Sequence, residues 1–287
     1  MIGVFDSGIG GLSVLRALKA ELPLEDFVYV ADAGHAPYGE RDDAHLIARA
    51  QAIAHYLLSQ HHIKALVVAC NTATAAAVHV LRAQYPQLPI VGVEPALKPA
   101  AALSKTKQVG VLATRATLGS AKFQALLQSL AGQAQFHCQP CDGLADALER
   151  GDAPKATQLS QQYVQALGPF GTDAGQMDAL VLGCTHYPFA QVELQALAGP
   201  GVTLIESGAP VARQTRRVLA TAQALAQAPP ATAGTATPHG DANPPHHTGQ
   251  LLFLTTGQPA LLAAALRRWL GVETPLVQAV QIPAVER

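Results

Sequence analysis

The sequence is poor in charge and has no long apolar run, and both absences narrow the possible functions. Only 14% of its 287 residues are Asp, Glu, Lys or Arg, and the formal net charge is -1. So little net charge creates no field that attracts nucleic acid or an anionic membrane. No run of about 18 apolar residues is present, and the start, MIGVFDSGIGG, has neither the basic segment nor the cleavage pattern of a secretory signal. We therefore expect a cytoplasmic protein that binds neither nucleic acid nor a membrane.

Cysteine is also scarce, which excludes a secreted disulfide framework and makes each thiol a candidate for chemistry. The four cysteines are Cys70, Cys138, Cys141 and Cys184. Cys138 and Cys141 form C-x-x-C, but the chain has no second C-x-x-C to complete a zinc site and no thioredoxin-like strand and helix around this one. We interpret this pair as structural or incidental, and we expect no metal site.

A further absence marks residues 226–250, where no apolar side chain is larger than alanine. The segment holds five prolines and three histidines, His239, His246 and His247. Such a composition cannot build a core, so the segment is predicted to be a mobile loop. A metal site made of the three histidines is the alternative, and a solvated linker is the favoured interpretation.

What the sequence does contain is an internal repeat centred on two cysteines. Residues 65–74, ALVVACNTAT, and residues 179–188, ALVLGCTHYP, align on Cys70 and Cys184. Each begins as an apolar run typical of a strand buried on both faces and continues with residues that favour a helix start. The two cysteines are therefore predicted to lie at equivalent strand-to-helix turns, where open α/β sheets bind their ligands.

Two cysteines at matched positions favour acid and base chemistry over the packing of small buried side chains. At a helix N-terminus the pKa of a thiol can fall from about 8.5 toward neutrality, which suits proton transfer. A nucleophilic cysteine would need a histidine base; His186 is available to Cys184, but no adjacent histidine serves Cys70. If the two halves face each other across a cleft, one thiolate can remove a proton from a carbon while the other thiol returns one from the opposite side. Such a transfer inverts a stereocentre.

The segment DSGIGG, residues 6–11, leaves two interpretations open. It lies between a predicted strand and a predicted helix, as a dinucleotide-binding turn does, and Asp32 ends the next strand, where such sites place a ribose-binding acid. The third glycine of G-x-G-x-x-G is replaced by Ser13, however, which argues against a nucleotide. The other interpretation is that the glycines let the backbone approach a small anion that Asp6 and Ser7 face.

The order of predicted elements indicates an α/β fold made of two similar halves. Predicted strands at residues 1–5 and 108–113 begin the halves, and the repeat cysteines are separated by nearly the same length of chain as these strands. We predict two pseudo-symmetric three-layer α/β/α domains, with mostly parallel sheets that face each other across a cleft. The first domain is expected to comprise residues 1–96 and 208–287, because a last strand at 251–254 should return to its sheet. The second is expected to comprise residues 97–207.

Helix boundaries are predicted from capping residues and prolines. Asn71 or Thr72 is expected to cap the helix after Cys70. Pro188 is expected at the first helical position after Cys184, behind a cap at His186 or Tyr187. Residues 120–130 are expected to form one helix.

Six short motifs occur in a fixed order along the chain. They are DSGIGG at residues 6–11, PYG at 37–39, CNT at 70–72, VEP at 93–95, AT with a second threonine at 113–117, and GCTHYP at 183–188. Together they closely resemble the glutamate racemases of the aspartate/glutamate racemase family, over residues 1 to about 215 and again at the final strand. The resemblance implies a cofactor-independent isomerase that interconverts L- and D-glutamate and supplies D-glutamate for peptidoglycan. It also implies a homodimer.

The resemblance assigns roles to residues of these motifs. Cys70 and Cys184 would be the two proton donors and acceptors, assisted by Asp6 and His186. The residues implied to contact substrate are Asp6, Ser7, Tyr38, Gly39, Asn71, Thr72, Thr114, Thr117, Glu149, Thr185 and His186. Since no Arg or Lys directly follows either cysteine, we expect the substrate carboxylates to bind backbone N–H groups and hydroxyls at helix N-termini.

Two alternative functions remain open at this point. A sister enzyme of the same group could racemise aspartate or another acidic amino acid. A non-catalytic nucleotide- or anion-binding module belongs to a different class, and such a module would need neither cysteine.

Overall fold

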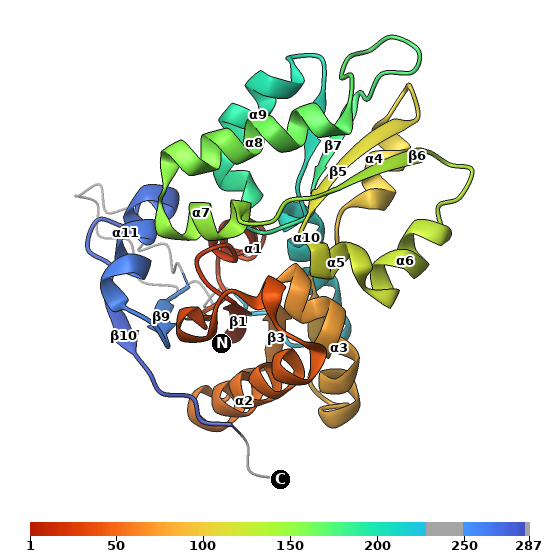
Figure 1. Ribbon diagram of the computed structural model, residues 1–287. Helices are drawn as coiled ribbons and strands as arrows, with labels where there is room; N and C mark the ends of the chain where they lie inside the picture. The colour runs from red at the N-terminus through yellow and green to blue at the C-terminus, as the bar shows by residue number, and fades with distance from the viewer. Residues whose placement is uncertain (228–248, 285–287) are drawn as a thin grey trace, which may run out of the picture.

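The structure is a computed structural model that describes residues 1–227 and 249–284. It contains two β-sheets, one of six strands and one of four (Figure 1). The predicted mobile loop at residues 226–250 lies outside the described residues, apart from its first two and last two positions, and so do His239, His246 and His247. In the described part of the chain, no helix is long and apolar enough to cross a membrane.

The first sheet has the order β10-β9-β2-β1-β3-β4, and all neighbouring strands are parallel. Its strands are β1 (Ile2–Asp6), β2 (Phe27–Ala31), β3 (Ala65–Val68), β4 (Ile90–Gly92), β9 (Leu251–Thr255) and β10 (Val277–Ala279). Every residue of β1, β2 and β3 is buried, because helices cover both faces of the sheet. One face packs against α1 (Leu12–Glu21), α10 (Gly208–Thr221) and α11 (Pro259–Leu270), and the other against α2 (Asp43–His61) and α3 (Asn71–Gln84).

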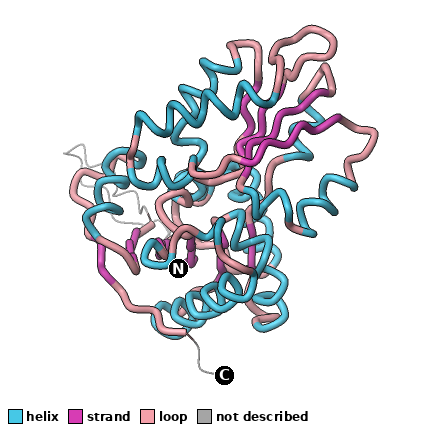
Figure 2. The backbone as a smooth tube through the Cα atoms, in the orientation of Figure 1, coloured by secondary structure: helices cyan, strands magenta, loops and turns pink. Residues whose placement is uncertain are grey.

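The second sheet has the order β6-β5-β7-β8 and is also parallel throughout. Its strands are β5 (Gln108–Ala113), β6 (Gln135–Pro140), β7 (Ala179–Leu182) and β8 (Thr203–Ile205). One face packs against α7 (Leu144–Arg150), α8 (Ala153–Leu167) and α9 (Gln191–Ala198), and the other against α4 (Leu97–Leu103) and α6 (Ala121–Gln128). Figure 2 shows the two groups of strands apart from each other, each among its own helices.

The shared strand order confirms the predicted pair of similar α/β domains. The order β2-β1-β3-β4 in the first sheet corresponds to β6-β5-β7-β8 in the second, so β3, before Cys70, matches β7, before Cys184. β9 and β10 extend only the first sheet, beyond β2. The predicted return of the 251–254 strand to that sheet is confirmed, since β9 pairs with β2 from Leu251 opposite Phe27 onward.

Two elements differ from the prediction for local reasons. The helix predicted at 120–130 is present as α6, which the Ser120 side chain caps, but a short helix that was not predicted precedes it, α5 (Arg115–Gly119), which the Thr114 side chain caps. The short edge strand β10 was not predicted, because its three residues are partly or fully exposed and form no apolar run.

Candidate active site

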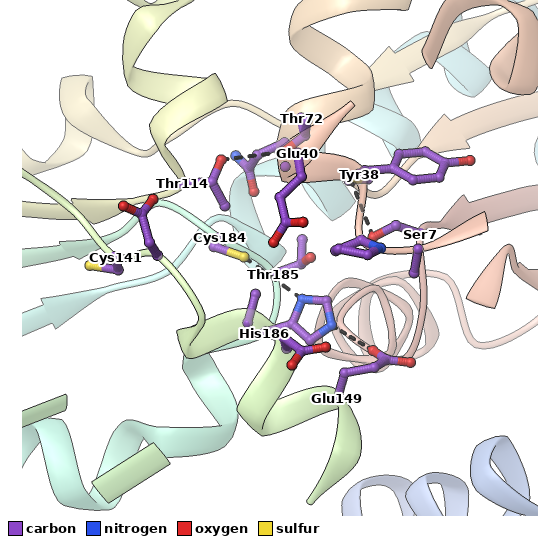
Figure 3. A pocket seen from close by; sticks show the side chains of 18 of the residues that line it. Ser7, Tyr38, Glu40, Thr72, Thr114, Cys141, Glu149, Cys184, Thr185 and His186 are labelled. Atoms are coloured by element: carbon purple, nitrogen blue, oxygen red, sulfur yellow. Dashed lines mark hydrogen bonds and ion pairs between the residues drawn. The ribbon is translucent and has the colours of Figure 1, made fainter. Parts of the chain in front are cut away.

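A cavity of about 400 Å³ lies at the carboxyl ends of the central strands of both sheets (Figure 3). Its wall is formed by Ser7, Ala36, Pro37, Tyr38, Gly39, Glu40, Cys70, Asn71, Thr72, Thr114, Arg115, Cys141, Asp142, Gly143, Ala145, Asp146, Glu149, Cys184, Thr185 and His186. Of the predicted site residues, Asp6 and Thr117 alone do not line it. The structure therefore gathers residues that are far apart in the sequence around one space that contains both repeat cysteines.

Cys70 is positioned by the end of β3 and the start of α3. It occupies the N-cap position of a helix that begins at Asn71, so the predicted cap at Asn71 or Thr72 is wrong. Its buried thiol donates to the Ser7 hydroxyl over a sulfur–oxygen distance of 3.7 Å. Burial, and next the charge of Asp6, raise the pKa of the Cys70 thiol far above its ordinary value, although a backbone N–H and the Ser7 hydroxyl oppose this. The expected fall in thiol pKa at the helix end is therefore wrong for Cys70, because burial outweighs it.

Cys184 follows β7 at the matching position, but the chain after it turns differently. A 3₁₀ helix, η3 (Tyr187–Ala190), comes next, with His186 as its N-cap, and α9 begins only after η3. The predicted cap at His186 is confirmed, but Pro188 is the second residue of the helix instead of the first, and the helix is a 3₁₀ helix. Cys184 therefore lacks the α-helix N-terminus that Cys70 has.

His186 places a positive charge beside Cys184. Its Nδ1 lies 3.7 Å from the Cys184 sulfur, and its Nε2 lies 2.7 Å from Oε2 of Glu149, which comes from α7 (Figure 3). Burial by itself would lower the pKa of His186, but its hydrogen bonds to Cys184 and Glu149 raise that pKa well above the ordinary value. An imidazolium between a carboxylate and a sulfur can stabilise a thiolate on Cys184.

The glycine-rich turn after β1 allows the two halves of the site to approach closely. A Cβ at Gly8 would collide with the Glu149 carboxylate and a Cβ at Gly10 with the His186 ring, so a larger residue at either position would displace a side chain of the site. The same Glu149 oxygen accepts from the Ile9 N–H at 2.9 Å. A carboxylate thus occupies the side of the turn where a nucleotide diphosphate would bind, which argues against the nucleotide alternative.

Asp6 lies behind the cavity wall and connects the two halves. One of its oxygens accepts from the N–H groups of Gly8 and Gly11 at 3.2 and 2.9 Å, and the other accepts from the Thr185 hydroxyl at 3.4 Å. Burial raises the pKa of Asp6, and the charge of His186 opposes the rise. Asp6 therefore joins the first half of the site to the residue next to Cys184.

The PYG segment is held by a buried ion pair. It follows η1 (Ala33–His35) and leads into η2 (Tyr38–Glu40). The Tyr38 hydroxyl donates to Asp32 at 2.6 Å, and the Arg49 guanidinium of α2 donates to both Asp32 oxygens at 3.0 and 2.9 Å. Asp32 is therefore bound to protein groups and buried, which leaves it unsuited to hold a ribose.

The predicted polar residues after β3 and β5 meet where the two halves come together. The Thr72 and Thr114 hydroxyl oxygens are 3.3 Å apart. Thr117 is buried behind Thr114, and the two side chains are hydrogen-bonded at 2.9 Å. Asn71 lines the cavity, and its buried Nδ2 has no hydrogen-bond partner among the described residues. This amide can thus donate a hydrogen bond to an oxygen of a ligand.

Some polar residues of the wall were missed from the sequence. They are Glu40, Arg115, Cys141, Asp142 and Asp146. Arg115 and Glu40 could have been found, because each directly follows a residue of a recognised motif. Asp142 and Asp146 lie just before and within α7, where the sequence carries no motif. Cys141 was interpreted as incidental, yet it is buried in the wall, and burial raises its pKa to about 12. All four cysteines are free, and Cys138 is exposed and lies outside the wall.

The chain is similar to known racemases along almost its whole length. A model of the Asp/Glu/Hydantoin racemase family matches residues 2–215. A glutamate racemase of Ectopseudomonas mendocina is 52% identical over 230 residues, which are 79% of this chain and 85% of that protein. A glutamate racemase isoform of Bacillus anthracis matches with a TM-score of 0.81 and 30% identity, over 99% of this chain and 98% of that one. A glutamate racemase of Francisella tularensis in complex with D-glutamate matches with a TM-score of 0.78 and 25% identity, over 98% and 97% of the two chains.

Proposed function

Because the chain belongs to the Asp/Glu/hydantoin racemase family, as the sequence motifs predicted, we propose that it interconverts L- and D-glutamate with Cys70 and Cys184 as the two proton-transfer groups. The chain is an amino-acid racemase and hence an isomerase. The observation that carries the two-thiol proposal is the cavity, since both cysteines line it and both follow matching strands of the two sheets. Glutamate is the proposed substrate because the Francisella relative was solved with D-glutamate bound.

The two thiols divide one inversion into two proton transfers. A thiolate on one side of the substrate takes the α-hydrogen as a proton, and the electron pair left on the α-carbon is delocalised into the adjoining carboxylate. The thiol on the other side donates its proton to the opposite face of the carbon and becomes the thiolate. The product is the other enantiomer, and the two sulfurs have exchanged roles. The reverse direction uses the same groups in the opposite order.

Each thiol has a neighbour that can assist it. We assign His186 to Cys184, because an imidazolium 3.7 Å from the sulfur stabilises the thiolate. Glu149 orients the His186 ring through Nε2. We assign Asp6 to the Cys70 side, because its charge acts on that thiol.

The substrate carboxylates are proposed to bind neutral donors of the cavity wall. The unpartnered Asn71 amide, the N–H groups at the start of α3 and the hydroxyls of Thr72, Thr114 and Thr185 are all at or beside the wall. Thr72→Val and Thr185→Val should each raise the KM for glutamate. An unchanged KM in both variants would contradict this mode of binding.

The proposed reaction needs no cofactor. Two protein thiols carry out both proton transfers. No described residue of the cavity wall is a lysine that could form a Schiff base with pyridoxal phosphate. Activity is expected to survive chelators, and the purified protein should show no pyridoxal absorbance. We further propose that the protein supplies D-glutamate for peptidoglycan in the cytoplasm and acts there as a homodimer.

The domain boundaries also remain a proposal, with residues 1–96 and 208–287 in the first domain and residues 97–207 in the second. Two observations support them. α4, which begins just after residue 96, packs on the second sheet, and α10, which begins at Gly208, packs on the first.

The proposed function is tested by circular dichroism of L-glutamate incubated with chelator-treated protein. The optical signal should decay to zero, and an arm with L-aspartate tests the sister activity. In deuterated water, early product should carry deuterium at the α-carbon while recovered substrate stays mostly protiated, because the returning thiol has already exchanged with solvent. A large share of retained hydrogen in early product would indicate a single base and contradict the two-thiol assignment.

A further inference from the structure

Most charged side chains of the cavity wall are acidic and would repel a dicarboxylate substrate, and Arg115 is the exception. Four acids line the cavity, Glu40, Asp142, Asp146 and Glu149. Arg115 is the sole lysine or arginine among the described residues of its wall. His186 is cationic, but it is already hydrogen-bonded to Glu149 on one side and to Cys184 on the other. Within the described wall, Arg115 is therefore the cation that an incoming acid can meet.

Arg115 is held in place by an ion pair that the fold does not require. It is the first residue of α5, directly after Thr114, and its Nη2 donates to Asp142 in the turn between β6 and α7. Both residues belong to the second half of the chain, so the pair does not hold the two sheets together. The two side chains are 69% and 57% exposed, and such exposed pairs contribute little to stability. Arg115 can exchange Asp142 for another carboxylate at small cost.

The depth of Arg115 decides which substrate carboxylate it can reach. The reacting carbon must lie between the two sulfurs, and Cys70 and Cys184 are only 5% and 7% exposed. Arg115 stands at the outer rim of the same cavity. It therefore meets the end of the substrate that is distant from the reacting carbon, which in glutamate is the side-chain carboxylate.

We propose that Arg115 is a specificity-determining residue that binds the side-chain carboxylate of the acidic amino acid, and that Asp142 holds its guanidinium until the substrate replaces it. This inference rests on the proposed glutamate racemase function. A planar guanidinium can offer two parallel N–H groups to a carboxylate, which hydroxyls and single amides cannot do. The proposal adds one charged contact at the rim to the neutral donors of the cavity wall.

A second ion pair at the same rim provides a matched control. Arg150 donates to Asp146 four residues earlier on α7, with the arginine 73% exposed. Asp146 lines the cavity, but Arg150 does not. Removing the Arg150 charge therefore tests the general effect of losing an exposed arginine near the site.

The experiment compares the racemisation kinetics of Arg115→Gln, Asp142→Asn and Arg150→Gln with those of the wild type. Arg115→Gln should raise the KM for glutamate about tenfold and leave kcat within about twofold, because a rim charge acts mainly on binding. Asp142→Asn should lower KM, since it removes the competitor for the guanidinium. Arg150→Gln should match the wild type. The KM of the wild type should also rise with salt, and that dependence should weaken in Arg115→Gln.

Glutamine, which has a neutral side-chain amide, tests the specificity. Wild-type protein should bind glutamate much better than glutamine in a competition assay, and Arg115→Gln should narrow this ratio about tenfold. A KM for Arg115→Gln within twofold of wild type would overturn the proposal. So would a shift in the same direction for Arg115→Gln and Asp142→Asn, which a merely structural ion pair would produce. Wild-type protein that fails to racemise glutamate would instead overturn the proposed function, and the two failures are thus distinguishable.

Discussion

The two cysteine half-sites occupy matching positions in a duplicated fold, yet their surroundings differ. Cys70 caps an α-helix, whereas Cys184 precedes a 3₁₀ turn. The group 3.7 Å from the Cys70 sulfur is the neutral Ser7 hydroxyl, and the group 3.7 Å from the Cys184 sulfur is the ring of His186. The fold therefore determines where the two sulfurs lie, and their neighbours give the two half-sites different polar surroundings.

This difference teaches that a symmetric reaction can start from an asymmetric resting state. Burial and the Asp6 charge raise the pKa of Cys70, so this thiol keeps its proton at neutral pH. The neighbour of Cys184 is the His186 ring, whose raised pKa makes it an imidazolium, so the second half-site carries a positive charge beside its sulfur. The two enantiomers of glutamate therefore present their α-hydrogens to sulfurs with different neighbours.

The largest effect is expected when one thiol is removed. Cys70→Ala and Cys184→Ala should each lower racemisation about a thousandfold or more, because each thiol is base in one direction and acid in the other. The double variant should be no worse than either single one, since groups that act as a unit are not additive. Circular dichroism of L- and D-glutamate provides the measurement, and Cys138→Ala, an exposed thiol outside the cavity, is the matched control.

Hydrogen exchange sharpens this comparison between the half-sites. Each single variant retains one base, which can remove and return a proton on its own face only. Nuclear magnetic resonance in deuterated water should then show exchange of the α-hydrogen in one enantiomer for Cys70→Ala and in the other for Cys184→Ala. Exchange of the same enantiomer by both variants would show that the thiols do not stand on opposite faces.

The next largest effect is expected at His186. His186→Asn should lower kcat/KM about a hundredfold, and by the same factor for both enantiomers, because L- and D-glutamate have equal free energies. The difference between the two half-sites should instead appear in the α-deuterium isotope effects of the two enantiomers. Proton transfer at Cys184 becomes limiting, so the isotope effect should grow for the enantiomer whose hydrogen faces Cys184 and shrink for the other. His55→Asn, an exposed histidine on α2, is the control, and equal isotope effects for both enantiomers would contradict the assignment.

Much of this arrangement could be predicted from the sequence because it rests on local patterns. Apolar runs identified the buried strands, including β9 after the segment without apolar residues. The repeat around Cys70 and Cys184 predicted their matching places, since the carboxyl ends of parallel strands meet at one edge of a sheet. The close approach of Glu149 to Gly8 is compatible with the glycines predicted to admit an anion, although that anion proved to be a side chain of the protein itself.

What the sequence could not predict depends on tertiary surroundings. The helix cue at Pro188 fits the first turn of a 3₁₀ helix as well as that of an α-helix. The raised pKa of Cys70 comes from burial, which no motif encodes. Arg115 and Asp142 follow different strands, and only the folding of the second sheet brings them together at the cavity rim.

A smaller effect is expected in the pH dependence of stability. His186 has a folded-state pKa above its unfolded value, so its contribution is complete below about pH 6.5 and is lost as pH rises through the folded pKa. Between those pH values, the free energy of unfolding should fall by up to about 1.4 kcal/mol per pH unit from this group. His186→Asn should remove that slope in urea unfolding between pH 6.5 and 8.5. Cys70→Ala should alter the profile only above about pH 9, where an unfolded thiol ionises.

The smallest effect is expected at Ser7, and it tests the difference between the two half-sites from the Cys70 side. The Ser7 hydroxyl is neutral and makes one long contact with Cys70, so Ser7→Ala should lower kcat/KM only about threefold. The isotope pattern should nevertheless be the mirror image of that in His186→Asn, with the larger effect for the enantiomer whose hydrogen faces Cys70. Ser59→Ala, an exposed serine on α2, should leave both quantities unchanged. If Ser7→Ala shifted the isotope effects in the same direction as His186→Asn, the two half-sites would not act on separate faces of the substrate, and the assignment of one neighbour to each thiol would be wrong.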